Sequence, residues 1–327
     1  VARRAKVSTA TVSRVLNNAT VVKSSTRARV LKAVQELKYH PNLHARTLAG
    51  GKSRTVGVIM SNLENPYFFD IYKTIESRAH SRGHEVVVAN TDYRPEQLAA
   101  SVQLMIGRRM AGIATVVSEM DSALVAELQE SQVPVVFYDA RGPNPNINNI
   151  RLNYKPGVER VVEYLHSVGH RRFGFIGHHS VLGPLNERQS VVLETVLRYS
   201  PSTEVRTAAD SDTLEGGRQA ARTLFSGGYA PTAVICVNDI MAVGALRELR
   251  EHGLRVPQDV SVTGFDNVKL SEFCSPALTT VHIPRERIGN IICDCLIPES
   301  GPPPVGREFV IDPEFVLRES TGPAPGV

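Results

Sequence analysis

The segment STATVSRVLN, residues 8–17, decides the fold of the N-terminal part of the chain. Ser8 is a residue type that caps helices, and Val12, Val15 and Leu16 follow at the spacing of one helical face. The remaining positions are small or polar. We therefore expect a short amphipathic helix over residues 8–17.

Two further helical patterns flank this segment. A short stub over residues 1–5 precedes it, and a longer pattern follows Ser24 and Ser25 and ends before Pro41, which disfavours a helical residue ahead of it. The inward positions of the longer pattern are Val30, Ala33, Val34 and Leu37. A short helix, a tight turn, a second short helix and a packing helix describe a helix-turn-helix. Because the stub lacks capping residues, we expect residues to be missing before Val1.

Charge is divided unevenly along the chain. Residues 1–54 hold twelve Lys or Arg and a single acid, Glu36, which is a formal charge of +11. The whole chain carries +4, so residues 55–327 carry −7. A basic N-terminal part on an acidic body is expected when only the basic part meets phosphate. An ordinary amphipathic surface helix, the alternative for residues 8–17, would have acids interspersed among its basic neighbours.

The second helix of a helix-turn-helix presents its N-terminal side chains to base edges, whereas hydroxyls and amides reach phosphates. The candidates for reading bases are Thr9, Ala10 and Arg14. The candidates for contacts with the DNA backbone are Ser8, Thr11, Ser13, Asn17 and Thr26.

The stretch VARRAKVSTATVSRVLNN, followed by STRARVLKAVQELKYHPNLHARTLAGGKSRTVGVIM, resembles the LacI/GalR family of bacterial repressors, and the resemblance continues through the whole chain. It implies that residues 43–49 become a hinge helix on operator DNA and that Leu48 enters the minor groove, where an apolar wedge kinks the duplex. One departure is Lys6, which stands where the family usually has Gly. If the backbone there is left-handed, a non-Gly residue costs about 1 to 2 kcal/mol.

Beyond the linker at residues 50–53, short apolar runs alternate with helical patterns. The runs are TVGVIMS (55–61), EVVVANT (85–91), AGIATVV (111–117), VPVVFYD (133–139), FGFIGH (173–178), TAVICV (232–237) and DVSVTGF (259–265). They predict an open α/β architecture with parallel sheets. The resemblance implies a two-lobed, periplasmic-binding-protein-like fold of type 1 with the ligand between the lobes. We expect strands around Thr280–His282 and Glu308–Ile311 to be crossovers between the lobes.

Ligands of open parallel sheets bind outside the carboxyl ends of the strands. Residues beyond these ends, or at positions that bind effector in the family, are the effector-binding candidates: Tyr67, Phe68, Asp92, Asn153, Arg188, Asn238 and Asp266. The alternatives are plain core packing for the aromatic residues and helix capping for Asn238, Asp239 and Asp266.

Asp and Asn acceptors, an Arg fork and aromatic faces suit the hydroxyls and ring of a carbohydrate. A nucleobase or nucleoside is the alternative effector, although Leu182 stands where purine-responsive members of the family place an arginine. The carbohydrate interpretation is also incomplete, because Asp212 stands where many sugar-responsive members have an aromatic residue.

Other classes of protein have less support. No glycine-rich phosphate loop follows the first strand and no GxSxG motif occurs, so we expect no enzyme. The cysteines lack the paired spacing of a zinc site, so no metal and no cofactor are expected. No apolar run approaches the roughly 20 residues of a membrane span and residues 1–6 form no secretory signal. A transport-linked binding protein is therefore disfavoured, as is a ligand-free dimerisation scaffold, because Asn238, Asp239 and Asp266 are in place.

The resulting expectation is a cytoplasmic, sequence-specific DNA-binding repressor that acts as a homodimer on a pseudo-palindromic operator and responds to a small effector, with a carbohydrate favoured. We expect a helix-turn-helix domain (1–41), a hinge helix and linker (42–54) and an effector-binding and dimerisation domain (55–327), whose lobes are residues 55–153 with 283–310 and 154–282 with 311–327.

Overall fold

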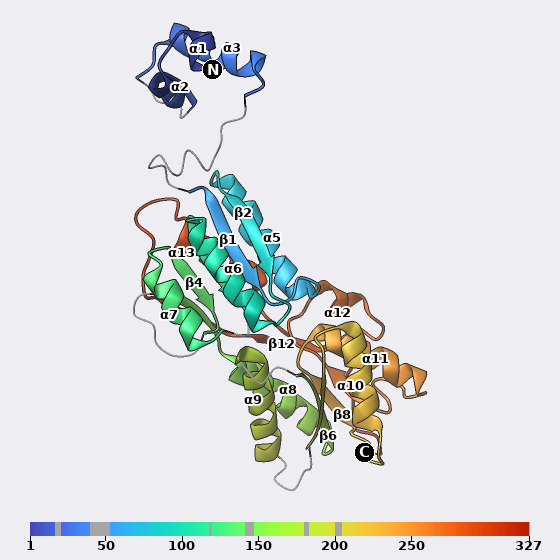
Figure 1. The fold of residues 1–327 in the computed structure, drawn as a ribbon. Coiled ribbons are helices and arrows are strands. Elements are labelled where there is room, and N and C mark those ends of the chain that lie inside the picture. The colour runs from blue at the N-terminus through green and yellow to red at the C-terminus, as the bar shows by residue number, and fades with distance from the viewer. Residues whose placement is uncertain are drawn as a thin grey trace. The chain divides into compact units, whose positions relative to one another are not determined.

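The computed structural model of the chain describes residues 1–16, 21–39, 53–117, 120–140, 147–179, 183–199 and 205–326. The chain divides into two compact units, Val1–Ser53 and Arg54–Val327, each described here by itself (Figure 1). Within the described ranges, no helix combines the length and the apolar character needed to cross a membrane.

The N-terminal unit is a three-helix module, which confirms the predicted helix-turn-helix. Its helices are α1 (Ala2–Ala5), α2 (Thr9–Leu16) and α3 (Ser24–Glu36). They enclose a small apolar core of Ala5, Val12, Val15, Val30 and Ala33. The turn between α1 and α2 passes through Lys6, whose φ of 53° and ψ of 51° are left-handed. The backbone strain expected from a non-Gly residue at this position is therefore present.

The first lobe of the larger unit is built on a six-stranded parallel sheet. Its strands are β1 (Thr55–Met60), β2 (Glu85–Asn90), β3 (Gly112–Val116), β4 (Val135–Tyr138), β5 (Asn148–Leu152) and β11 (Glu308–Ile311), in the spatial order β11-β5-β4-β3-β1-β2. Helices α5 (Pro66–Ser81) and α13 (Arg285–Leu296) cover one face, and α6 (Pro95–Gly107) and α7 (Ser122–Glu130) cover the other (Figure 1). Both faces are covered, so the central strands β1, β3 and β4 are apolar along almost their whole length rather than alternating.

The second lobe repeats this plan around four parallel strands. They are β6 (Phe173–His178), β7 (Val205–Asp210), β8 (Ala233–Cys236) and β9 (Ser261–Thr263), in the order β7-β6-β8-β9. Helix α8 (Tyr154–Ser167) packs against α9 (Gly183–Tyr199), α10 (Leu214–Phe225) packs against α11 (Asp239–Glu251), and the short α12 (Lys269–Phe273) follows β9. The two lobes confirm the predicted α/β fold class.

One of the two predicted crossovers is wrong. The segment Glu308–Ile311 is β11, an edge strand of the first lobe that pairs in parallel with β5. The strand that pairs antiparallel with β10 (Thr280–His282) is instead β12 (Glu314–Val316), which follows β11 directly. The sequence pattern could not separate these two short apolar runs, because only their pairing partners distinguish them.

A buried carboxylate fixes the place where the chain first leaves the first lobe. Asp139, directly after β4, accepts the backbone N–H of Leu152 at 3.0 Å and the hydroxyl of Tyr154 at 2.6 Å. Burial raises the pKa of Asp139 to about 6, although both hydrogen bonds lower it. The start of α8 is thereby tied to the end of β4, next to the edges of the two sheets that face each other.

Helices α10 and α11 approach each other so closely that only glycine fits at their contact. A methyl group on Gly217 would lie 2.2 Å from the backbone oxygen of Met241, and one on Gly244 would lie 2.0 Å from that of Leu214. Such overlap requires the helix backbones themselves to move. This contact holds in place the helices whose N-termini follow β7 and β8.

We predict that Gly217→Ala lowers the free energy of unfolding by about 3 kcal/mol, because overpacking against backbone is not relieved by a side-chain rotation. Gly107→Ala is the matched control, since a methyl group there meets nothing within 4 Å. We expect the control to stay within about 1 kcal/mol of the unmodified chain. Urea unfolding followed by circular dichroism measures both; equal effects of the two changes would contradict this account of the contact.

Candidate functional site

Helix α2 of the N-terminal unit presents a polar face to solvent. Thr9, Ala10, Ser13 and Arg14 are exposed, whereas Val12 and Val15 point into the core. Ser8 caps the helix, because its hydroxyl accepts the backbone N–H of Thr11 at 3.1 Å. The side chains predicted to read bases are thus displayed on one helix face, as a recognition helix requires.

The positive charge around this helix is largely uncompensated. The only acid of residues 1–54, Glu36, is engaged by Arg4 at 2.7 Å. Arg14 and Lys23 are both exposed, and Lys23 directly precedes α3. Thr26 and Thr11 are half-buried. Asn17 and Leu48, also predicted to contact DNA, lie outside the described residues, as does the hinge segment 43–49.

In the larger unit, the carboxyl ends of the two sheets converge on one enclosed cavity. It is lined by Asn65, Tyr67, Phe68, Tyr93, Val117, Tyr138, Arg188, Asp212, Asn238 and Asp266. The first six come from the first lobe and the last four from the second. The cavity of about 20 Å³ has room for about one water molecule. Polar side chains bond across the gap between the lobes, with Asn65 and Tyr93 donating to Asp212.

An arginine lies at the centre of the cavity wall. The guanidinium of Arg188 donates to Asp266 at 3.2 Å and to the backbone oxygen of Val237 at 2.9 Å, and it stacks on the rings of Phe265 and Tyr154. Its buried Nε has no hydrogen-bond partner among the described residues. Burial raises the pKa of Asp266 to about 7, against the lowering effect of Arg188.

Aromatic side chains form the opposite wall. The rings of Tyr67 and Phe68 meet edge to face at 5.4 Å, and the buried hydroxyls of Tyr67 and Tyr138 share a hydrogen bond. Tyr67 and Phe68 lie in the first turn of α5, where Asn65 caps the helix by accepting the backbone N–H of Tyr67 at 3.0 Å. The capping residue thus also fixes two aromatic residues of the cavity.

Asn238 lines the cavity and also caps a helix, whereas its neighbour Asp239 makes structural bonds and does not line the cavity. Asn238 caps α11 by accepting the backbone N–H of Met241, and its amide N–H donates to Asp212. Asp239 accepts the backbone N–H of Val268 and the hydroxyl of Thr280. Burial, reinforced by the nearby Asp266, raises the pKa of Asp239 to about 8. For Asn238, helix capping and a place at the cavity are therefore compatible.

The structure brings five of the seven predicted effector-binding residues together at the cavity: Tyr67, Phe68, Arg188, Asn238 and Asp266. Asp92 does not line it, since its side chain is exposed and pairs with Arg94 at 3.5 Å. Asn153 does not line it either, because its amide donates to Asp312 beside β11 at 2.8 Å. Five further residues line the cavity and were not predicted from the sequence, although each follows or ends a strand: Asn65, Tyr93, Val117, Tyr138 and Asp212.

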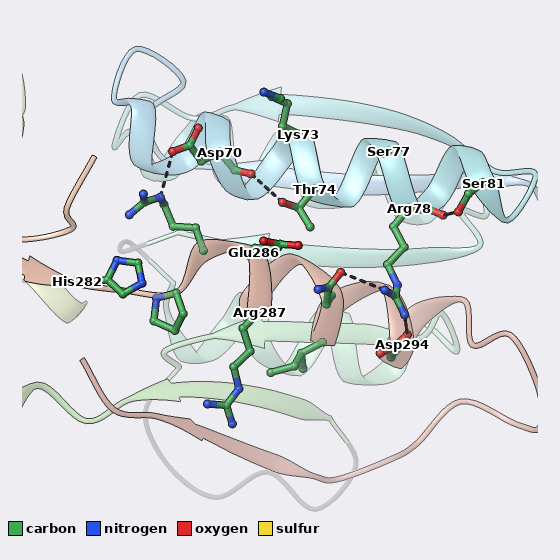
Figure 2. A pocket seen from close by; sticks show the side chains of 14 residues that line it. Asp70, Lys73, Thr74, Ser77, Arg78, Ser81, His282, Glu286, Arg287 and Asp294 are labelled. Carbon is green, nitrogen blue, oxygen red and sulfur yellow. Dashed lines mark hydrogen bonds and ion pairs between the residues drawn. The ribbon is translucent and has the colours of Figure 1, made fainter. Parts of the chain in front are cut away.

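A larger groove lies on the outside of the first lobe, between α5 and α13 (Figure 2). It measures about 1020 Å³, and two ion pairs lie along it: Arg285 with Asp70 at 3.1 Å and Arg78 with Asp294 at 3.0 Å. No Phe or Tyr side chain lines it among the described residues. The convergent polar and aromatic groups of the interlobe cavity make that cavity the candidate ligand site.

Comparison with known proteins agrees with both units. Residues 1–42 match the family of bacterial regulatory proteins described as lacI family, and residues 162–321 match the periplasmic binding protein-like domain. The chain is 32% identical to the HTH-type transcriptional repressor CytR of Escherichia coli (strain K12), over 99% of this chain and 96% of that protein. It is 30% identical to the repressor PurR of Photobacterium profundum, over 98% and 97%.

Solved structures give the same result. The Lac repressor dimer bound to operator and the anti-inducer ONPF superposes with a TM-score of 0.83 at 28% identity, covering 98% of this chain and 97% of that one. A complex of the transcriptional regulator CelR with cellobiose superposes with a TM-score of 0.68 at 26% identity, covering 98% of each chain. The chain belongs to the lacI family of bacterial regulatory proteins and is a DNA-binding transcriptional regulator.

Proposed function

We propose that the chain is a cytoplasmic repressor, acting as a homodimer on a pseudo-palindromic operator, whose DNA affinity changes when a small molecule bearing hydroxyl groups binds between the lobes. The observation that carries the proposal is the interlobe cavity, in which Arg188 and Asp266 from one lobe face Tyr67 and Tyr138 from the other. A second copy of the chain would double the base contacts of the single recognition helix.

A hydroxyl group suits this cavity because it both donates and accepts hydrogen bonds. The Asp266 carboxylate accepts, while the unpartnered Nε–H of Arg188 donates. The aromatic wall provides an apolar face for a sugar ring or a base. Sugars and nucleosides share this chemistry, so they are the effector classes that we propose, with the carbohydrate favoured by the acceptor-rich wall. Ligand binding, rather than catalysis, is what these groups support.

The regulatory step follows from the closed arrangement of the lobes. An effector that prefers one lobe arrangement shifts the equilibrium by its differential affinity and by no more. Arg285, at the start of α13, donates to Asp70 on α5 and to the backbone oxygens of Asp266 and Asn267. A change at the Asp266 loop would therefore reach α5 and α13 of the first lobe directly.

For DNA binding, we predict that Arg14→Ala weakens binding to a selected operator roughly 10- to 100-fold and affects random DNA less, because a base contact is lost. Lys23→Ala should weaken both and reduce the salt dependence by about one unit of slope, because a phosphate contact is lost. The operator is obtained by selection from a random duplex pool, and fluorescence anisotropy measures each affinity. Equal losses for Arg14→Ala on operator and random DNA would refute its base-reading role.

For effector binding, we predict that one or more members of a set of monosaccharides, disaccharides and nucleosides raise the melting temperature. At a concentration of 100 Kd the stabilisation is about 2.7 kcal/mol, or roughly 5 to 10 °C for a unit of this size. Asp266→Asn should abolish the shift, and Asp259→Asn, whose carboxylate pairs with the exposed Arg255, should not. A shift that survives Asp266→Asn would place the effector elsewhere.

A further inference from the structure

Asp212 is one of the points at which the two lobes are tied together, beside the contact of Arg285 with the Asp266 loop. It lies just beyond β7 in the second lobe and is 3% exposed. Its carboxylate accepts the side-chain N–H of Asn65 at 3.3 Å and the hydroxyl of Tyr93 at 2.5 Å, and its backbone oxygen accepts the amide of Asn62 at 3.1 Å. All three donors belong to the first lobe, so Asp212 ties the two lobes together across the cavity.

The donor side of this contact is held in a costly conformation. Asp92 and Tyr93 have φ of 55° and 56°, so two successive non-Gly residues are left-handed. Each such residue costs about 1 to 2 kcal/mol and persists only where its surroundings impose it. The turn directs the Tyr93 side chain to the second lobe, where its hydroxyl meets Asp212 and its ring lies 4.6 Å from that of His178.

The two sides of this contact differ in the kind of ligand group that could take the place of the partner. Amide and hydroxyl groups both donate and accept hydrogen bonds, so Asn62, Asn65 and Tyr93 can bond to donors or to acceptors of a ligand. A carboxylate accepts hydrogen bonds, and Asp212 keeps one donor from its own lobe, Asn238. When a ligand separates the lobes, the ligand atoms facing Asp212 must therefore carry O–H or N–H groups.

Charge strengthens this restriction. Asp212 and Asp266 line the same cavity, while the nearby guanidinium groups are already engaged, Arg188 by Asp266 and Arg285 by Asp70. A phosphate or carboxylate on the ligand would meet the buried carboxylate of Asp212, whose side-chain hydrogen-bond partners among the described residues, Asn62, Asn65, Tyr93 and Asn238, carry no positive charge. Like charges brought together in a poorly solvated site cost far more than they do in water.

We propose that Asp212 determines effector specificity: it holds the lobes together through donors of the first lobe, and it admits only an uncharged effector whose O–H or N–H groups replace those donors. The phosphorylated forms of the same sugars and nucleosides are excluded. This inference rests on the proposed effector cavity, and it adds the class of effector that the cavity takes.

The closing role is tested without any effector, by hydrogen exchange and mass spectrometry on the full chain. Asp212→Asn and Tyr93→Phe should each accelerate amide exchange about 10-fold or more in residues 61–65 and 91–94. Asp210→Asn is the matched control, because the Asp210 carboxylate bonds only to Ser211 among the described residues. Unchanged exchange in both Asp212→Asn and Tyr93→Phe would overturn the closing role.

The specificity is tested by calorimetric titration with ribose, adenosine and cytidine and with their 5′-phosphates. The unmodified chain should bind an uncharged member of the set at least 100-fold more tightly than its phosphate, and Asp212→Asn should reduce that ratio below 10-fold. Undiminished discrimination in Asp212→Asn, or tight binding of a phosphate by the unmodified chain, would overturn the assignment. If none of the six compounds binds, the proposed effector class fails, and the exchange measurement still decides whether Asp212 closes the lobes.

Discussion

The larger unit depends on one constraint: two parallel sheets face each other through the carboxyl ends of their strands. Polar side chains at those ends are buried between the lobes, and a buried polar group without a partner is costly. Many of these groups bond to one another, Arg188 to Asp266 and the first-lobe donors to Asp212. A ligand must offer equivalent bonds to take their place, and that requirement makes the cavity selective.

The same constraint explains how a change at the cavity would reach the helices of the first lobe. Arg285 binds the backbone of the Asp266 loop and the side chain of Asp70, so the loop at the cavity and helix α5 share one cation. Asp139 ties the end of β4 to the start of α8, where the chain passes into the second lobe. Packed elements of this kind change between discrete arrangements rather than deforming smoothly. In the proposed mechanism, an effector acts by stabilising one lobe arrangement over another.

Much of this architecture could be predicted from the sequence. The spacing of Val12 and Val15 gave the recognition helix, the apolar runs gave most of the strands, and the strand-end rule with the family resemblance gave Arg188, Asn238 and Asp266. The failures have physical causes. A left-handed turn places the side chain of Asp92 in solvent and that of its neighbour Tyr93 at the cavity. The sequence does not predict this turn, because neither residue is glycine. Asn153 meets Asp312, a partner 159 residues away that only the folded chain reveals.

The central claim is that the cavity and the DNA-binding unit are coupled, and reciprocal binding tests it most directly. The affinity of the full chain for its operator is measured with and without a saturating compound from the sugar and nucleoside set, and the affinity for that compound is measured with and without operator. Thermodynamic linkage predicts the same factor in both directions, in the range of roughly 5- to 150-fold. A compound that fills the cavity while leaving operator affinity unchanged would contradict the account.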